Sequence, residues 1–337
     1  MTLCLCEEKI EHKYISFYVG NGGYDPTRTT NLRNVFVRDM TKRFAKLRGA
    51  IRKAVIEEDC FALKRNSGGF AVMADIVTPG KVAFDFPRAG DKVSAFMKWL
   101  QKQEQAGILE VTQGARFGTA IEQAWQNRYI QSAYQQGILR ARQEMKKAGI
   151  KGIPPVTGGI SSVFNQPFHL DRVGLLYTRV FSDLQGITHQ MDTQISRVLS
   201  QGMADGKGPV ELARLLTRTI SGPVGDLSLT DTLGRFIPAE RRAEILARTE
   251  IIRAHHQATI QEYKGWKVEG VVVKAEWRTA GDERVCEECG SWQGQIFDLK
   301  EADSLIPLHP QCRCIVLPVD MTGREPGEGG EIRRRTT

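Results

Sequence analysis

The sequence predicts a mainly α-helical protein, with several helices in its N-terminal and central regions and a small α+β cysteine-rich module near its C-terminal end. Three observations lead to this fold class. Apolar residues recur every three or four positions over long stretches, strand-like segments are few and short, and four of the seven cysteines lie within residues 286–314. No internal repeat of fixed period accompanies them.

The composition is that of a globular protein large enough for two or three hydrophobic cores. The chain has 337 residues, 41% hydrophobic and 26% charged, with a formal net charge of +8. No apolar run approaches the roughly 18 residues that a membrane span needs. The apolar start of the chain is interrupted by Glu7 and Glu8 before it could serve as a secretion signal. We therefore expect a protein folded in a cytoplasm, without a membrane partner.

An arm and a helical domain are expected in the first part of the chain. Residues 1–30 are turn-rich, and residues 31–147 should form helices around 31–59, 91–105 and 114–147, with a β-hairpin near 70–86. Apolar stripes predict the two longer helices. The stripes comprise Phe36, Met40, Phe44, Leu47, Ile51 and Val55 in the first, and Ile121, Trp125, Ile130, Tyr134, Ile138 and Met145 in the last.

A basic segment coincides with the first of these helices. Between Arg28 and Arg65, eleven Lys or Arg residues stand against four acids. Such a face suits contact with nucleic acid or with an acidic protein partner, although a solvated helix face gives the same pattern. The candidate binding residues are Arg38, Lys42, Arg43, Lys46, Arg48, Arg52 and Lys53.

The rest of the chain should contain a linker, a central helical region, the α+β module and a tail. Residues 148–162 are rich in Gly and Pro, and residues 163–239 resume a helical pattern in which Pro209 should occupy a first helical position. The module spans 240–320, and residues 321–337 are expected to be disordered. The module's long helix, beginning after Pro238, should turn inward Ile245, Thr249, Ile252, His256, Ile260 and Tyr263.

Two adjacent histidines in this helix suggest catalysis or metal binding at first sight. Neighbouring helical residues point about 100° apart, so His255 and His256 cannot share one ligand. His256 joins the apolar stripe. We therefore interpret both as core or boundary histidines.

Five potential metal ligands lie close together in the module. Cys286 and Cys289 form a Cys-x-x-Cys pair, and "HPQCRC" supplies His309, Cys312 and Cys314. This spacing suits two ligand pairs closing on one tetrahedral ion, and a reducing compartment favours structural zinc over disulfides. A Cys-x-x-Cys turn gathers ligands more easily than two cysteines at the start of a strand. We therefore favour Cys286, Cys289, His309 and Cys312, with Cys314 as the reserve ligand.

Other roles for these cysteines stay open at the level of sequence. They could be buried free thiols, a redox-active pair, or partners in disulfides formed later in a particle exposed to oxidising surroundings. A catalytic metal would keep one coordination position open to water. Four or five soft ligands in so small a module argue for a closed site.

Three blocks, in order, resemble the phage Mu F-like family of minor head (head morphogenesis) proteins. They are a helix with Arg-Thr-Glu-x-x-Arg, a Cys-x-x-Cys segment after Asp-x-Arg, and a closing His-Pro-x-Cys-Arg-Cys. The resemblance covers about residues 240–320, and Val285 stands where the family pattern has Thr. Besides the five ligand candidates, the residues that carry it are Arg248, Thr249, Glu250, Arg253, Asp282, Arg284, Pro310 and Arg313. Glu250 and Arg253, three residues apart, can pair on the helix, and we expect them to tie it to the cysteine module.

The resemblance implies a minor structural protein of a tailed-phage head, without enzymatic activity, that acts in head morphogenesis. Its implied place is the virion head near the portal vertex, after assembly in the host cytoplasm. The implied partner is the portal protein, with capsid or scaffold protein and double-stranded DNA as further candidates. Two alternatives are a zinc-dependent nuclease or other metalloenzyme built on the Cys/His module, and a non-enzymatic DNA-binding protein.

Overall fold

The structure, a computed structural model, describes residues 25–63, 82–111, 123–150, 153, 156–222, 237–268 and 273–320. This part of the chain is mainly helical, with a small antiparallel sheet and a Cys/His cluster toward its C-terminal end, which confirms the predicted fold class. It divides into two compact units, each assembled from segments far apart in sequence. Unit 1 takes its residues from 1–36, 126–180 and 245–337, and unit 2 from 37–125 and 181–244.

Unit 2 contains most of the first helix. Helix α1 (Thr30–Arg52) continues into the π-helix η1 (Lys53–Glu57), so the expected helix over 31–59 is present with a change of winding near its end. Its predicted apolar stripe, of which only Phe36 belongs to unit 1, is buried throughout, at 0–4% exposure. Burial of this stripe supplies the hydrophobic free energy that holds the helix in place.

Besides residues 239–244, which begin helix α7 (Ala239–Val268), three more helices contribute to unit 2. They are α2 (Ala89–Ala106), the second half of α5 (Pro167–Ala204), and α6 (Pro209–Ser221), whose first position holds Pro209 as predicted. The expected hairpin near 70–86 falls largely outside the described residues, and residues 82–86 have no regular structure. The next helix, expected over 114–147, begins only at Asn127: residues 124–126 are not helical, and Ala124 forms an isolated antiparallel bridge with Val111, which ends helical winding there.

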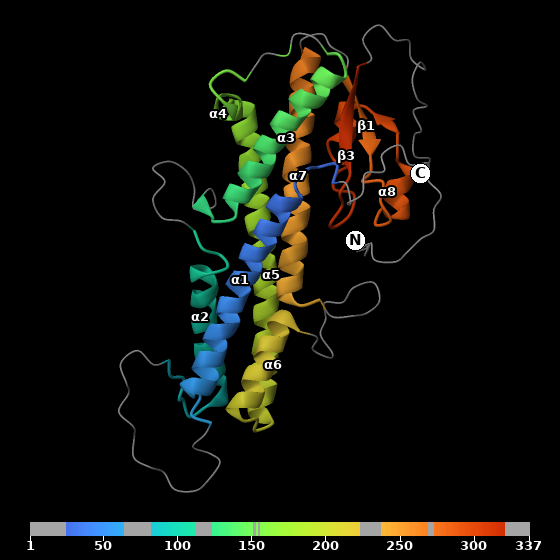
Figure 1. Ribbon diagram of the computed structural model, residues 1–337. Helices are drawn as coiled ribbons and strands as arrows, with labels where there is room; N and C mark the ends of the chain where they lie inside the picture. The colour runs from blue at the N-terminus through green and yellow to red at the C-terminus, as the bar shows by residue number, and fades with distance from the viewer. Residues whose placement is uncertain are drawn as a thin grey trace. The chain divides into compact units, whose positions relative to one another are not determined.

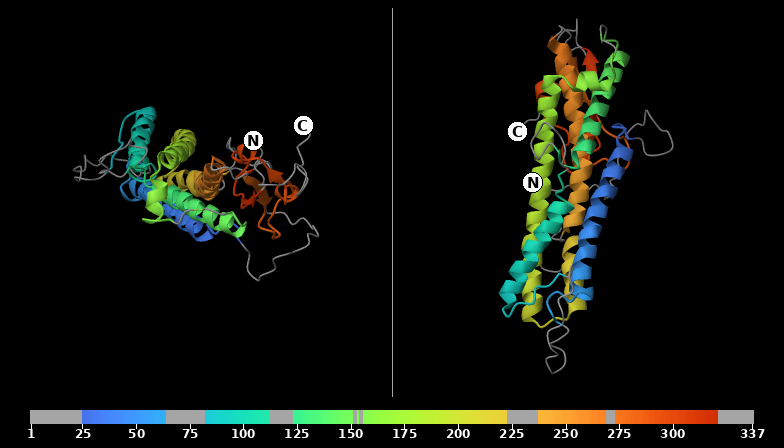
Figure 2. Two further views of the ribbon diagram at one scale, coloured as in Figure 1. Left: turned by 90° about the horizontal axis from the view of Figure 1, so that it is seen from above. Right: turned by 90° about the vertical axis from the view of Figure 1, so that its left-hand side faces the viewer.

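Unit 1 is built around two long helices that run side by side, α3 (Asn127–Lys147) and α7 (Ala239–Val268) (Figures 1 and 2). They approach closely at Gly137, where an added Cβ atom would lie 2.3 Å from the carbonyl oxygen of His255. Glycine is needed there because any side chain would collide with the backbone of α7. The short helix α4 (Ile160–Phe164) and the first part of α5 complete the helical part of this unit.

Helix α7 is buried on more than its predicted face. Of the six residues expected to face inward, Ile245 is only half-buried and the other five are buried. Ile251, Ala254, His255 and Ala258 are buried as well. A helix with apolar contacts on several sides is typical of the centre of a packed unit.

A three-stranded antiparallel sheet completes unit 1, in the order β2 (Ile296–Phe297), β1 (Val273–Arg278), β3 (Ile315–Asp320). Alternate β1 residues, among them Ala275 and Trp277, point into a core shared with α7. Two short helices, α8 (Glu287–Ser291) and α9 (Leu299–Ala302), lie between the strands in sequence. Strand β3 begins at Ile315, so both cysteines expected to open it precede it.

No helix within the described ranges is both long enough and apolar enough to cross a membrane. The expected tail at 321–337, and residues 1–24 of the expected arm, fall outside the part of the chain that the structure describes.

Candidate functional site

The five predicted ligands come together in unit 1. Cys286 and Cys289 stand at the start of α8, where the backbone N–H of Cys289 donates to the Cys286 sulfur at 3.4 Å. His309, Cys312 and Cys314 lie in the loop that leads into β3. The loop and α8 are thus brought together across more than twenty residues of sequence.

Cys289 is the centre of this cluster. The Nε2 atom of His309 lies 3.3 Å from the sulfur of Cys286 and 3.1 Å from that of Cys289, and the sulfurs of Cys289 and Cys312 are 4.0 Å apart. Two groups of three residues have their donor atoms within 4.8 Å of one another: Cys286, Cys289 and His309, and Cys289, Cys312 and Cys314. Both groups contain Cys289, and the described residues therefore include a candidate metal centre.

Crowding of these donors shifts their proton affinities in opposite directions. Hydrogen bonds among the thiols raise the pKa of Cys289 and lower that of Cys312. Burial alone would lower the pKa of His309, but hydrogen bonding to Cys286 and the charge of Cys312 raise it to about 9. The donor groups are thus close enough to perturb one another's protonation.

A charged clamp joins the two motif blocks that carry the ligands. Arg313 donates two hydrogen bonds, of 2.7 and 2.6 Å, to the carboxylate of Asp282, and Arg284 donates a third at 2.9 Å. Burial would raise the pKa of Asp282, but the two guanidinium groups outweigh it and hold the pKa at about 2. Bidentate arginine–carboxylate pairs fix orientation as well as distance. The clamp thereby connects the segment before Cys286 to the loop around Cys312.

Thr249 connects the motif helix to the ligand loop. Its hydroxyl accepts a 3.0 Å hydrogen bond from the backbone N–H of Gln311 and donates to the carbonyl of Ile245. Gln311 has a positive φ of 62°, a backbone conformation that non-glycine residues adopt rarely. The hydrogen bond holds this turn directly beside Cys312. The apolar stripe places Thr249 on the inward face of α7 but does not reveal this contact.

The predicted Glu250–Arg253 pair is present, at 3.1 Å, but its second partner differs from our expectation. Glu250, 2% exposed, also faces Arg179 of α5 at 3.5 Å. The pair thus ties α7 to α5 within unit 1, while Thr249 makes the connection to the ligand loop. Arg248 lies among other cations: burial lowers the pKa of Arg33, and the charges of Arg313 and Arg248 lower it further.

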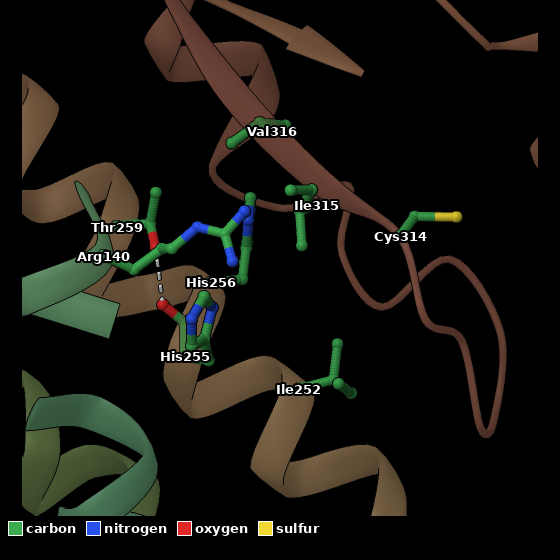
Figure 3. A pocket seen from close by; sticks show the side chains of 8 residues that line it. All are labelled: Arg140, Ile252, His255, His256, Thr259, Cys314, Ile315 and Val316. Carbon is green, nitrogen blue, oxygen red and sulfur yellow. Dashed lines mark hydrogen bonds between the residues drawn. The ribbon is translucent and has the colours of Figure 1, made fainter. Parts of the chain in front are cut away.

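His255 and His256 are core histidines, as predicted. They are 4% and 3% exposed, and burial lowers their pKa values to about 3 and 4, so both are neutral near pH 7. His256 Nε2 lies 2.8 Å from the carbonyl oxygen of Ala302, which lets the ring donate to that oxygen. Figure 3 shows both rings with Arg140 beside a small cavity bounded by β3. Their place between α3, α7 and the sheet is structural.

Two polar networks of unit 1, one partly buried and one buried, have no signal in the sequence. Arg172 donates to Asp303 at 2.7 and 2.9 Å, with Lys264 3.0 Å from the same carboxylate. His169, fully buried, lies 3.0 Å from Glu262. His169 and Glu262 are 93 residues apart, and Arg172 and Asp303 are 131 apart. Because residues so far apart in the sequence leave no periodic pattern, these pairs can be recognised only in the folded structure.

The seven basic candidates separate into two groups in unit 2. Arg43 lies 2.7 Å from Glu110 and over the ring of Trp125, and Arg48 pairs with Glu240. Arg38, Lys42, Lys46, Arg52 and Lys53 are exposed. We call these five the basic stripe. Spacings of four residues place the first three along one face of α1.

Comparison with known proteins bears on the C-terminal part of the chain. Residues 193–317 match the family model described as Phage Mu protein F like protein. No curated protein and no solved structure was found to match the chain. The match includes every block on which the resemblance was based, from the Arg-Thr-Glu-x-x-Arg helix to the His-Pro-x-Cys-Arg-Cys loop. It therefore confirms the resemblance of this region to phage Mu F-like proteins, a family that suggests a role in phage head morphogenesis.

Proposed function

We propose that this protein is a minor structural component of a tailed-phage head that binds the portal protein during head assembly and stays near the portal vertex of the virion. The observation that carries the proposal is the joining of the three motif blocks in unit 1. Thr249 holds the Gln311 turn and Asp282 clamps Arg313, so residues shared with the family pattern build one rigid module. The family match over residues 193–317 supports the same conclusion.

A structural role is favoured over catalysis by the burial of the cluster. Cys289 and Cys312 are 2% and 1% exposed, and His309 is 9% exposed. A hydrolytic metal site needs a position open to water and substrate. Cleavage of DNA by the purified protein with Mg²⁺ or Zn²⁺, lost on His309→Ala, would instead support the zinc-dependent nuclease.

The direct experiment is protein mass spectrometry on procapsids and virions of the phage that encodes this chain. We expect the protein in both particles, at fewer copies than the major capsid protein, and retention with the portal protein when the two are co-expressed. Capsid or scaffold protein would be recognised as further partners in the same co-purification. Absence from procapsids and virions alike would overturn the proposal.

The basic stripe fits contact with the phosphate backbone of packaged double-stranded DNA. Among the described residues, none forms an ion pair with Arg38, Lys42 or Lys46, so their charge is available to a partner. Positions 38 to 52 extend over about 21 Å of helix. This length allows several phosphates to be contacted along one face.

Salt-dependent binding to duplex DNA tests this contact. Lys42→Ala with Lys46→Ala should reduce the slope of log affinity against log salt by about 2, since each phosphate contact contributes about 0.9. Lys98→Ala with Lys102→Ala is the matched control, because this exposed pair on α2 has the same spacing. Equal slopes for the two double variants would contradict the assignment. Tight DNA binding by a protein absent from particles would instead favour the plain DNA-binding alternative.

A further inference from the structure

We propose that Cys286, Cys289, His309 and Cys312 hold one structural zinc ion, with Cys314 outside the coordination shell. The assignment rests on the geometry of unit 1 and is independent of the proposed role in head assembly. The ion would close α8 onto the loop that precedes β3.

The distances around Cys289 suit a tetrahedral site. Zinc–sulfur bonds of about 2.3 Å and zinc–nitrogen bonds of about 2.0 Å place tetrahedral sulfurs about 3.8 Å apart and a sulfur–nitrogen pair about 3.5 Å apart. The Cys289–Cys312 sulfurs are separated by 4.0 Å, and His309 Nε2 lies 3.1 and 3.3 Å from its two sulfur neighbours. At least one of the distances from Cys312 to Cys286 and His309 exceeds 4.8 Å, so the Cys312 sulfur would have to move by about 1 Å to complete the site.

His309 has the ring orientation that such a site requires. Its Nδ1 atom lies 2.8 Å from the carbonyl oxygen of Pro310. A carbonyl oxygen only accepts, so Nδ1 carries a proton, and loss of the other ring proton on metal binding would leave the lone pair on Nε2. That lone pair faces the sulfurs of Cys286 and Cys289. A backbone acceptor on the far nitrogen is the usual means of orienting a metal-bound histidine.

The surroundings hold the ligands in place before an ion binds. The Asp282–Arg313 clamp connects the two ligand-bearing segments, and Thr249 fixes the backbone at Gln311, next to Cys312. Preorganised ligands lose less conformational entropy on binding. Three thiols and one imidazole form a soft set that suits zinc and not magnesium or calcium.

Cys312 is preferred to Cys314 because of the loop that precedes β3. Cys312 follows the constrained Gln311 turn, and its backbone N–H donates to the carbonyl of His309 at 3.2 Å, which keeps the two ligands of that loop together. Cys314 borders the cavity beside His256 and directly precedes β3 (Figure 3). Both sulfurs lie within 4.8 Å of Cys289, so the preference rests on the backbone of the loop.

Metal content of the full-length reduced protein is the test. We expect about one zinc per chain by elemental analysis, and a tetrahedral thiolate spectrum when Co²⁺ replaces zinc. Cys312→Ser should lose the ion, whereas Cys314→Ser should keep it. Cys60→Ser, which alters a buried free cysteine of unit 2, is the matched control and should also keep it.

Three other outcomes would contradict the proposed zinc site or its ligands. No bound metal after supplementation with zinc, with a Cys289–Cys312 disulfide or free thiols instead, would rule out the site. Two ions per chain would rule out a single centre. Loss of zinc in Cys314→Ser but not in Cys312→Ser would show that Cys314, and not Cys312, is the fourth ligand. If a variant fails to fold, release of one zinc from the wild-type protein on titration with a mercurial reagent gives the stoichiometry directly.

Discussion

Asp282 is the residue at which the two ligand-bearing segments of the module are joined. Asp282→Asn keeps the shape of the side chain but removes the charge that attracts Arg284 and Arg313. Because the carboxylate is partly exposed, solvent screening limits the expected loss to about 1 kcal/mol of unfolding free energy. Urea denaturation measures it, and Glu283→Gln, an exposed neighbouring acid, should leave the midpoint unchanged.

The same residue predicts a response to acid. The pKa of Asp282 is lowered from 3.8 to about 2, so its contribution to stability is complete above about pH 4 and disappears as the pH falls toward 2. The stability difference between wild type and Asp282→Asn should therefore shrink across this interval. A constant difference would mean that the ion pairs do not stabilise the module.

At the scale of elements, the close approach of α3 and α7 depends on Gly137. An alanine Cβ there would lie 2.3 Å from the His255 carbonyl oxygen and 2.8 Å from the Cβ of Ala258, so the helices must separate. We expect Gly137→Ala to destabilise unit 1 by about 1–3 kcal/mol. Thermal unfolding followed by circular dichroism measures the change.

Gly174→Ala provides the matched control in the same unit. It lies inside α5 with no atom within 4 Å of the added Cβ. Alanine should raise helix stability there by about 0.5–1 kcal/mol. Similar behaviour of both alanine variants would contradict the close helix contact.

At the scale of the whole molecule, each compact unit has its own stability determinants. In unit 2, Glu104 of α2 and Asp192 of α5 are buried together, 3% and 9% exposed. Burial, and then the neighbouring Asp192, raise the pKa of Glu104 to about 10, and burial raises that of Asp192. One proton shared between the two carboxyl groups is the arrangement that avoids two adjacent buried charges.

This pair predicts that unit 2 becomes less stable in alkali. A group with a raised folded pKa contributes its full stability below its unfolded pKa, near 4.5, and loses it as the pH rises toward 10. The melting temperature should therefore fall between pH 5 and pH 9, by about 2–4 °C for each kcal/mol lost. Glu104→Gln should flatten this dependence, and an unchanged pH profile would refute the shared proton.

The sequence by itself predicted most of the helices and the resemblance of the module to phage Mu F-like proteins. The stripe from Phe36 to Val55 is buried as predicted, and Pro209 begins α6, because periodicity and proline geometry are local properties. The spacing of Cys286, Cys289, His309 and Cys312 indicated a ligand cluster for the same reason, since each pair lies within one turn or short loop.

Only the tertiary structure decided which distant residues meet. In the folded chain, Arg43 and Arg48 pair with acids, whereas the basic stripe is exposed. Glu250 faces Arg179, and Thr249 accepts a hydrogen bond from Gln311. These contacts join residues separated by 62 to 192 positions. They depend on how helices pack against one another, which hydrophobic periodicity does not encode, because it specifies a buried face and not the partner that covers it.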